Sequence, residues 1–418
     1  MNVDTATIPA HPQASRMFTL SCVALIVTAM TFAIRAGILG ELGAQYGFSN
    51  EQLGWINSMA FLGFPLAMIF GGLLYNYLGA KKLLWLAFVC HFLGLTMTIF
   101  STSFAGLLVS TFFVGFANGA VEAGCNPLIS DLYKNNKTTM LNRFHVWFPG
   151  GIVIGALVSA GMTKIGLTWE YQIGIMLIPT FIYGFMLMGC KFPTFPQYEN
   201  ALSSTMSNIK SLWSFMFIFL MICMTITATT ELGTQQWITN LLGATGAHPM
   251  LILALMTGIM AVGRFFAGPL VHTFNPTGVL FVSAILSTLG LFLMIQLEGS
   301  AIYIAAVVFA LGVTYFWPTM IGCVAEYQPK TGALGMSLIG GAGMFALSVW
   351  NPIIGGWIDS AQATAAANNL SGDALIVASG QEVLSIIIFL PASLIVLLGG
   401  FYFYMRKTHK AHGILQPD

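Results

Sequence analysis

In residues 115–151, GFANGAVEAGCNPLISDLYKNNKTTMLNRFHVWFPGG, a glutamate interrupts a long apolar run. An Asn-Pro break, a short basic loop and a second apolar run follow it. We interpret the stretch as two membrane helices joined by a cytoplasmic turn. Glu122 precedes the first loop residue, Asp131, by nine residues, about 14 Å of helix in a hydrocarbon layer about 30 Å thick. An ionisable side chain at that depth must face a polar cavity or a partner, so we predict that Glu122 belongs to a functional site.

The composition is that of an integral membrane protein. Of 418 residues, 57% are hydrophobic and 7% are charged, whereas soluble domains carry about 25% charged residues. The net charge of +1 gives no case for nucleic-acid binding. The six cysteines are scattered singly, without the spacing of a metal site or a disulfide framework. The first apolar run has no small-residue cleavage site, so we expect it to remain as a membrane helix.

Apolar runs separated by short polar breaks predict an all-α protein with twelve membrane-spanning helices. We place the spans at 17–41, 53–77, 82–101, 104–131, 142–163, 172–190, 211–240, 248–271, 278–297, 300–326, 332–358 and 383–405. Residues 1–16 form a cytoplasmic tail, 17–190 a six-helix half, 191–210 a cytoplasmic linker, 211–405 a second six-helix half, and 406–418 a second cytoplasmic tail. With the N-terminus inside, every Lys and Arg except Arg35 and Lys164 falls on the cytoplasmic side, as the positive-inside rule requires.

The two halves share an internal repeat. The sequence FGGLL at 70–74 matches FAGPL at 266–270 at the same place in its half, and the match continues without gaps to 84 and 280. Asn126-Pro127 in the fourth predicted span has a counterpart in Trp317-Pro318 in the tenth. Two similar halves with polar groups at mid-depth predict a secondary transporter that works by alternating access.

The loop after the second predicted helix resembles the signature of the major facilitator superfamily. The sequence GLLYNYLGAKK at 72–82 carries the likeness, with Asn76 where the signature usually has aspartate. An asparagine can still hydrogen-bond to a neighbouring helix end but brings no charge. We take Asn76 and Lys81 as candidate gating residues.

Within that superfamily the chain is most similar to the fucose:proton symporter family. The likeness rests on Glu122 with Asn126-Pro127, on Leu141-Asn142 followed by the glycine pair at 150–151, on GRF at 263–265, and on the aromatic-Pro-Thr motif at 317–319. The resemblance implies proton-coupled uptake of a monosaccharide across a bacterial cytoplasmic membrane, with Glu122 as a coupling residue.

Glu122 and Arg35 each leave alternatives open. Glu122 is a candidate proton carrier, half of a static ion pair with Arg35, or a ligand for a sugar hydroxyl. Arg35 lies about 9 Å below the outer edge of the first helix, so it must be paired or face water. It is expected to neutralise Glu122, which suits a neutral sugar, or to clamp a substrate anion with its planar fork, which suits a sugar acid. A third alternative is that it only reaches the interface.

The sequence TTELGTQQW at 229–237 predicts a local irregularity at Gly233 that lines a cavity, because polar or irregular backbone is tolerated at mid-depth only in such places. Glu231 is a second candidate for ion coupling. Glu231, Gln235 and Gln236 are also candidate sugar ligands, since a carboxylate and amides match the paired donors and acceptors of sugar hydroxyls; structural packing is the alternative.

The remaining candidates come from the polar and aromatic residues of the other helices. Those proposed to contact substrate are Asn126, His145, Trp147, Tyr315, Trp317 and Asn351, with Trp and Tyr rings as platforms for the apolar face of a sugar. His145 is also a candidate proton relay or an ordinary polar cap. Arg264, placed at the cytoplasmic end of its helix, is expected to anchor the inner gate or to meet lipid headgroups.

These observations predict a monomeric, proton-coupled symporter of a small sugar in a lipid bilayer. The alternatives are a carrier of an anionic substrate such as a sugar acid, with Arg35 as the clamp, and sodium-coupled sugar symport. No phosphate-binding loop, catalytic triad or metal cluster is visible in the sequence, so we expect neither an enzyme nor a cofactor.

Overall fold

The computed structural model describes residues 12–48, 50–194, 201–237, 241–242 and 249–411, and within these ranges all regular structure is helical. The first half contains α1 (Ala14–Tyr46), α2 (Asn50–Phe100), α3 (Phe104–Leu132), α4 (Lys137–His145), α5 (Trp147–Lys164), α6 (Trp169–Gly174) and α7 (Leu177–Gly189). Helix α9 (Ala201–Ser211) lies in the predicted linker.

The second half contains α10 (Phe215–Ala228), a π-helical turn η1 (Thr229–Gly233), α11 (Thr234–Gln236), α13 (Pro249–Phe265), α14 (Ala267–Gln296), a 3-10 turn η2 (Gly299–Ala301), α15 (Ile302–Val313), α16 (Phe316–Tyr327), a 3-10 turn η3 (Pro329–Thr331), α17 (Gly332–Ala367), α18 (Gly372–Ile387) and α19 (Phe389–Ala411).

The predicted membrane spans have helical counterparts in the described residues. Ten helical stretches are long and apolar enough to cross a bilayer. One of them, Trp55–Phe100, is broken at Gly79 and therefore accounts for two predicted spans. The shorter apolar helix Ile252–Phe265, together with the first part of α14, accounts for the predicted span at 248–271. The protein is therefore an all-α, multi-pass membrane protein, as the hydropathy pattern predicted.

The internal repeat has a structural counterpart in two helix breaks. Gly79 (φ 68°, ψ 167°) interrupts α2, and Asn275 (φ 53°, ψ 169°) interrupts α14. The two residues are at matching positions of the repeat, and both need the left-handed φ that Gly and Asn adopt most readily. The Asn275 side chain accepts hydrogen bonds from Thr277 Oγ1 (2.7 Å) and from the Gly278 amide (3.1 Å), so it caps the helix that restarts after the break.

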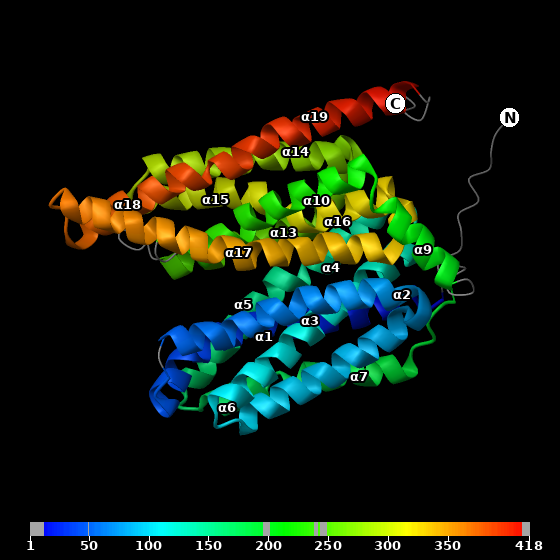
Figure 1. The fold of residues 1–418 in the computed structure, drawn as a ribbon, viewed down its shortest axis with the longest axis horizontal. Coiled ribbons are helices and arrows are strands. Elements are labelled where there is room, and N and C mark those ends of the chain that lie inside the picture. Colours follow the sequence, from blue (N-terminus) through cyan, green and yellow to red (C-terminus); the bar gives the residue numbers. More distant parts are fainter. Residues whose placement is uncertain (1–11, 49, 195–200, 238–240, 243–248, 412–418) are drawn as a thin grey trace.

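The two halves form two bundles that lie side by side, joined at one end by α9 (Figure 1). We call this the linker end. Helix α1 also begins at this end (Figure 1), where the Gln13 side chain accepts a hydrogen bond from the Lys191 amide at 2.7 Å. The halves meet where α2 and α3 pack against α17. They also meet where α4 packs against α13 and α16, and where α5 packs against α13. A Cβ at Gly72 would lie 2.6 Å from Ser337 Cβ, so α2 and α17 touch almost backbone to backbone.

Candidate functional site

Charged and aromatic side chains from both halves enclose a small cavity at the centre of the molecule. It is lined by Glu122, His145, Phe148, Glu231, Leu232, Arg264, Trp317 and Met344. We call these eight residues the central cluster. The cavity volume is ≈ 10 Å³, about what one water molecule needs, so the cluster is closed to a sugar in this conformation.

Arg264 is the centre of the cluster and is almost fully buried. Its Nη2 donates to Glu231 Oε1 at 2.7 Å in a buried ion pair. Its Nε donates to the Thr314 carbonyl at 2.7 Å and its Nη1 to the His145 carbonyl at 3.2 Å. Because His145 belongs to the first half and Arg264 to the second, this guanidinium joins the two halves.

Two prolines explain why these carbonyls are free to accept. In an α-helix the carbonyl of residue i bonds to the N–H of residue i+4, and proline has no N–H. Pro149 lies four residues after His145, and Pro318 lies four residues after Thr314. Each proline therefore leaves one main-chain oxygen without its helical donor, and Arg264 donates to both.

Glu122 is as deeply buried as Glu231 but has no cation of its own. Its Oε2 accepts a hydrogen bond from Asn126 Nδ2 at 3.3 Å, and Asn126 Oδ1 is 3.2 Å from His145 Nε2. Within the described part of the chain, no lysine or arginine forms an ion pair with Glu122. The cluster thus holds two carboxyl groups and one guanidinium, and Asn126 links the Glu122 carboxyl group to the His145 imidazole.

The predicted irregularity in the seventh span is confirmed, as the π-helical turn η1. Its extra residue per turn rotates the chain locally and is typical of functional sites. The turn carries Glu231 into the interior beside Arg264. The neighbouring Thr229 and Thr230 hydroxyls donate to main-chain carbonyls one turn earlier at 2.8 and 2.9 Å, so they brace the helix rather than face the cavity.

The alternative in which Arg35 forms an ion pair with Glu122 is wrong for this conformation. Arg35 Nε donates to Asn57 Oδ1 at 2.8 Å, and the guanidinium lies 5.2 Å from the centre of the Phe32 ring. The side chain is only 8% exposed, and its Nη1 is buried without a hydrogen-bond partner. The Phe32 ring in turn packs against Phe148 of the central cluster, with 5.8 Å between ring centres.

Several predicted substrate ligands do not reach the central cluster. Trp147 is 38% exposed and does not line the cavity. The Tyr315 hydroxyl donates to the Gly263 carbonyl at 2.8 Å, which braces α13. Gln235 Nε2 lies 3.2 Å from Met260 Sδ. The side chains of Gln236 and Asn351 lie outside the described residues.

The predicted gating residues occupy different environments. Asn76 donates to Thr205 Oγ1 of α9 at 3.1 Å, and Lys81 donates to the Cys190 carbonyl at 3.3 Å, so both bind the chain near the linker end. Arg264 does not meet lipid headgroups. That part of the prediction is wrong, because its guanidinium is only 1% exposed and belongs to the central cluster.

Three cavity residues were missed by the sequence reasoning: Phe148, Leu232 and Met344. Apolar side chains carry no signal that separates a cavity wall from ordinary packing. The sequence did carry such a signal at Arg264, because this residue lies seven residues, about 10 Å, before the end of its predicted span at residue 271. The depth argument that singled out Arg35 applies to it equally.

Two bundles that enclose a charged, buried cluster between them define a membrane transporter. The family model described as the Major Facilitator Superfamily matches residues 21–234, and the chain belongs to that family. The fold is similar to a solved transporter of the same superfamily, FucP in the outward conformation, with a TM-score of 0.69, 15% identity, and coverage of 90% of this chain and 98% of that one.

Two curated relatives are described as transporters of small molecules. One is the putative niacin/nicotinamide transporter NiaP of Bacillus subtilis (strain 168), 23% identical over 194 residues, which are 46% of this chain and 48% of the relative. The other is a D-xylose transporter of Levilactobacillus brevis, 26% identical over 164 residues, which are 39% of this chain and 35% of the relative. The chain thus matches less than half the length of each.

Proposed function

We propose that the protein couples the movement of a proton to the transport of a small sugar by alternating access. The observation that carries the proposal is the charge balance of the central cluster, in which Glu231 and Glu122 share one guanidinium. Arg264 compensates Glu231 through a direct ion pair. Glu122 is 2% exposed and accepts a hydrogen bond from the Asn126 amide, but within the described residues it forms no ion pair.

A bound proton removes this imbalance. A buried carboxylate without a cation costs several kcal/mol, and a neutral carboxyl group avoids that cost. In the closed conformation Glu122 therefore holds a proton. When one end of the bundle opens, water reaches the cluster and the ionised form becomes tolerable, so the proton leaves on that side. Asn126 and His145 extend from Glu122 toward the second half and provide the polar path.

A sugar suits the same cluster. Trp317 offers an aromatic face, and Asn126, His145 and the carboxyl groups offer both donors and acceptors for hydroxyl groups. The relative described as a D-xylose transporter supports this substrate class. The linker end is proposed to be cytoplasmic, because the Lys and Arg distribution favours that side, and a bacterial cytoplasmic membrane is the proposed location.

The test is uptake into proteoliposomes that carry an imposed pH gradient, with neutral pentoses and hexoses beside a hexuronate. Glu122→Gln is expected to lose accumulation but to keep exchange of a neutral sugar, because the amide keeps the shape and removes the titration. Glu298→Gln, at an exposed position, is the matched control and should accumulate sugar normally. Accumulation by Glu122→Gln equal to that of the wild type would refute the coupling role. A sodium gradient in place of the pH gradient tests the sodium-coupled alternative.

A second candidate, transport of an anionic substrate, is favoured by Arg35. Its Nη1 is buried without a partner, and an orphaned guanidinium donor is costly unless a ligand satisfies it. A carboxylate would accept from Nη1 beside the Asn57 contact. In the same assay this candidate predicts that only the hexuronate accumulates, and that Arg35→Gln abolishes its uptake.

A further inference from the structure

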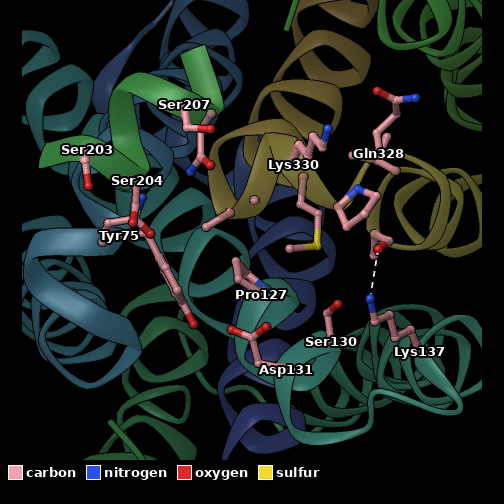
Figure 2. A pocket seen from close by; sticks show the side chains of 18 residues that line it. Tyr75, Pro127, Ser130, Asp131, Lys137, Ser203, Ser204, Ser207, Gln328 and Lys330 are labelled. Atoms are coloured by element: carbon pink, nitrogen blue, oxygen red, sulfur yellow. Dashed lines mark hydrogen bonds between the residues drawn. The ribbon is translucent and has the colours of Figure 1, made fainter. Parts of the chain in front are cut away.

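A second cavity, of ≈ 430 Å³, lies at the linker end between the two halves (Figure 2). Small-molecule sites are typically about 300–1,000 Å³, so its size suits a ligand rather than a single water. Its wall comes from three parts of the chain: the first half, the linker helix α9, and the segment from α16 to α17.

The cavity and the central cluster lie on the same three helices. On α3 the cluster contains Glu122 and the cavity contains Ser130. On α16 the corresponding residues are Trp317 and Val324, and on α17 they are Met344 and Met336. Each pair is seven or eight residues apart, about 10–12 Å along its helix. The cavity therefore lies directly on the path from the cluster to the linker end.

Two contacts between the halves separate the cavity from the cluster. Asn142 Nδ2 of α4 donates to Thr319 Oγ1 of α16 at 3.2 Å, and Thr319 lies between the cluster and cavity positions of that helix. Met68 of α2 packs against Gly340 of α17, which lies between Met344 and Met336. Opening the linker end must break both contacts and would join the two spaces.

Hydroxyl and amide groups form most of the polar wall. Helix α9 contributes Ser203, Ser204 and Ser207, and Figure 2 shows them on one side of the cavity, with Ser130 and Asp131 on the opposite side. Lys137 donates one hydrogen bond, to the Ala325 carbonyl at 3.0 Å, and keeps two further N–H groups for other acceptors. This mixture of donors and acceptors matches the hydroxyl groups of a sugar.

We propose that this cavity is a second sugar subsite, on the release side of the transport path, and that the linker helix α9 forms part of its wall. A sugar that leaves the central cluster enters it when the Asn142–Thr319 contact opens. The inference rests on the proposed function, since it assumes that a sugar is the substrate. It adds a role for α9 in binding, beyond joining the halves.

Single-cysteine reporters test the subsite. All six native cysteines are buried, so Ser207→Cys can be labelled with a maleimide on the otherwise native chain. Met206→Cys is the matched control, because Met206 is exposed on the same helix but does not line the cavity. With the transported sugar at ten times its dissociation constant, labelling of Ser207→Cys should slow about tenfold, while labelling of Met206→Cys should not change.

Sidedness provides the second measurement. Removing the hydroxyls with Ser204→Ala and Ser207→Ala should raise the KM for efflux from the linker side and leave the KM for uptake from the opposite side unchanged. Equal protection of both cysteine reporters, or of neither, refutes the subsite, as does an equal change in the two KM values. Absence of transport for every sugar refutes the proposed function itself, whereas normal sugar transport without protection refutes the subsite alone.

Discussion

Removal of the negative charge at Glu231 should destabilise the closed conformation strongly, and Glu231→Gln makes this change with little alteration of shape. The variant removes the carboxylate that is directly paired with Arg264, although the glutamine oxygen can still accept its hydrogen bond. Coulomb's law with an effective dielectric constant of about 20 gives an attraction of about 6 kcal/mol at the observed 2.7 Å. Part of this is offset by desolvation of both groups, and buried pairs that lose one partner typically lose about 3–5 kcal/mol. We expect a loss within that range.

The assay is thermal unfolding in detergent, followed with a thiol-reactive dye, because unfolding exposes the six buried cysteines. The double variant Glu231→Leu with Arg264→Met is the control, since it removes both charges and keeps apolar volume. It should unfold at a higher temperature than Glu231→Gln, because apolar replacement of a buried pair is often neutral or stabilising. A Glu231→Gln protein as stable as the wild type would refute the ion-pair argument.

Three further predictions concern packing and polar contacts. Gly72→Ala should push α2 and α17 apart and increase labelling of the native cysteines, whereas Gly161→Ala, with nothing within 4 Å, should not. Asn118→Leu removes a partner of the buried His91, 2.8 Å away, and should cost about 1–3 kcal/mol in the free energy of unfolding; unchanged thermal stability would contradict this. Asn142→Leu removes a hydrogen bond between the halves worth about 1 kcal/mol, so fluorescence distance measurements across the linker end should report about a fivefold larger open population.

Depth in the membrane could be predicted from the sequence, but the direction in which each side chain points could not. Counting residues from the polar loops placed Glu122 and Glu231 at mid-depth, and both lie in the central cluster. The same counting allowed a pair between Arg35 and Glu122, which the structure does not contain. Which residues pair depends on the rotation of each helix about its axis, and packing between helices sets that rotation.

Breaks and irregularities in the helices were predictable where polar residues interrupt or separate the apolar spans. The irregularity at Gly233 followed from polar residues inside an apolar span, and the breaks at Gly79 and Asn275 fall where the two spans on either side were separated. The contribution of α9 to the wall of the linker-end cavity was not predictable, because α9 lies in a polar connection and lines the cavity only through its contacts with both halves.

The contacts of Arg264 with proline-freed carbonyls have a consequence for how this protein tolerates sequence change. The arginine binds the first half through a main-chain oxygen, so no side-chain substitution at His145 can remove its acceptor. In a mutational scan of the cluster, substitutions at His145 should therefore leave this link between the halves intact. Substitutions at Pro149 should weaken it, because any other residue restores the N–H that competes with Arg264 for the His145 carbonyl. The link between the halves therefore depends on the missing N–H of Pro149, four residues after His145. It can persist when the surrounding side chains change to suit another substrate.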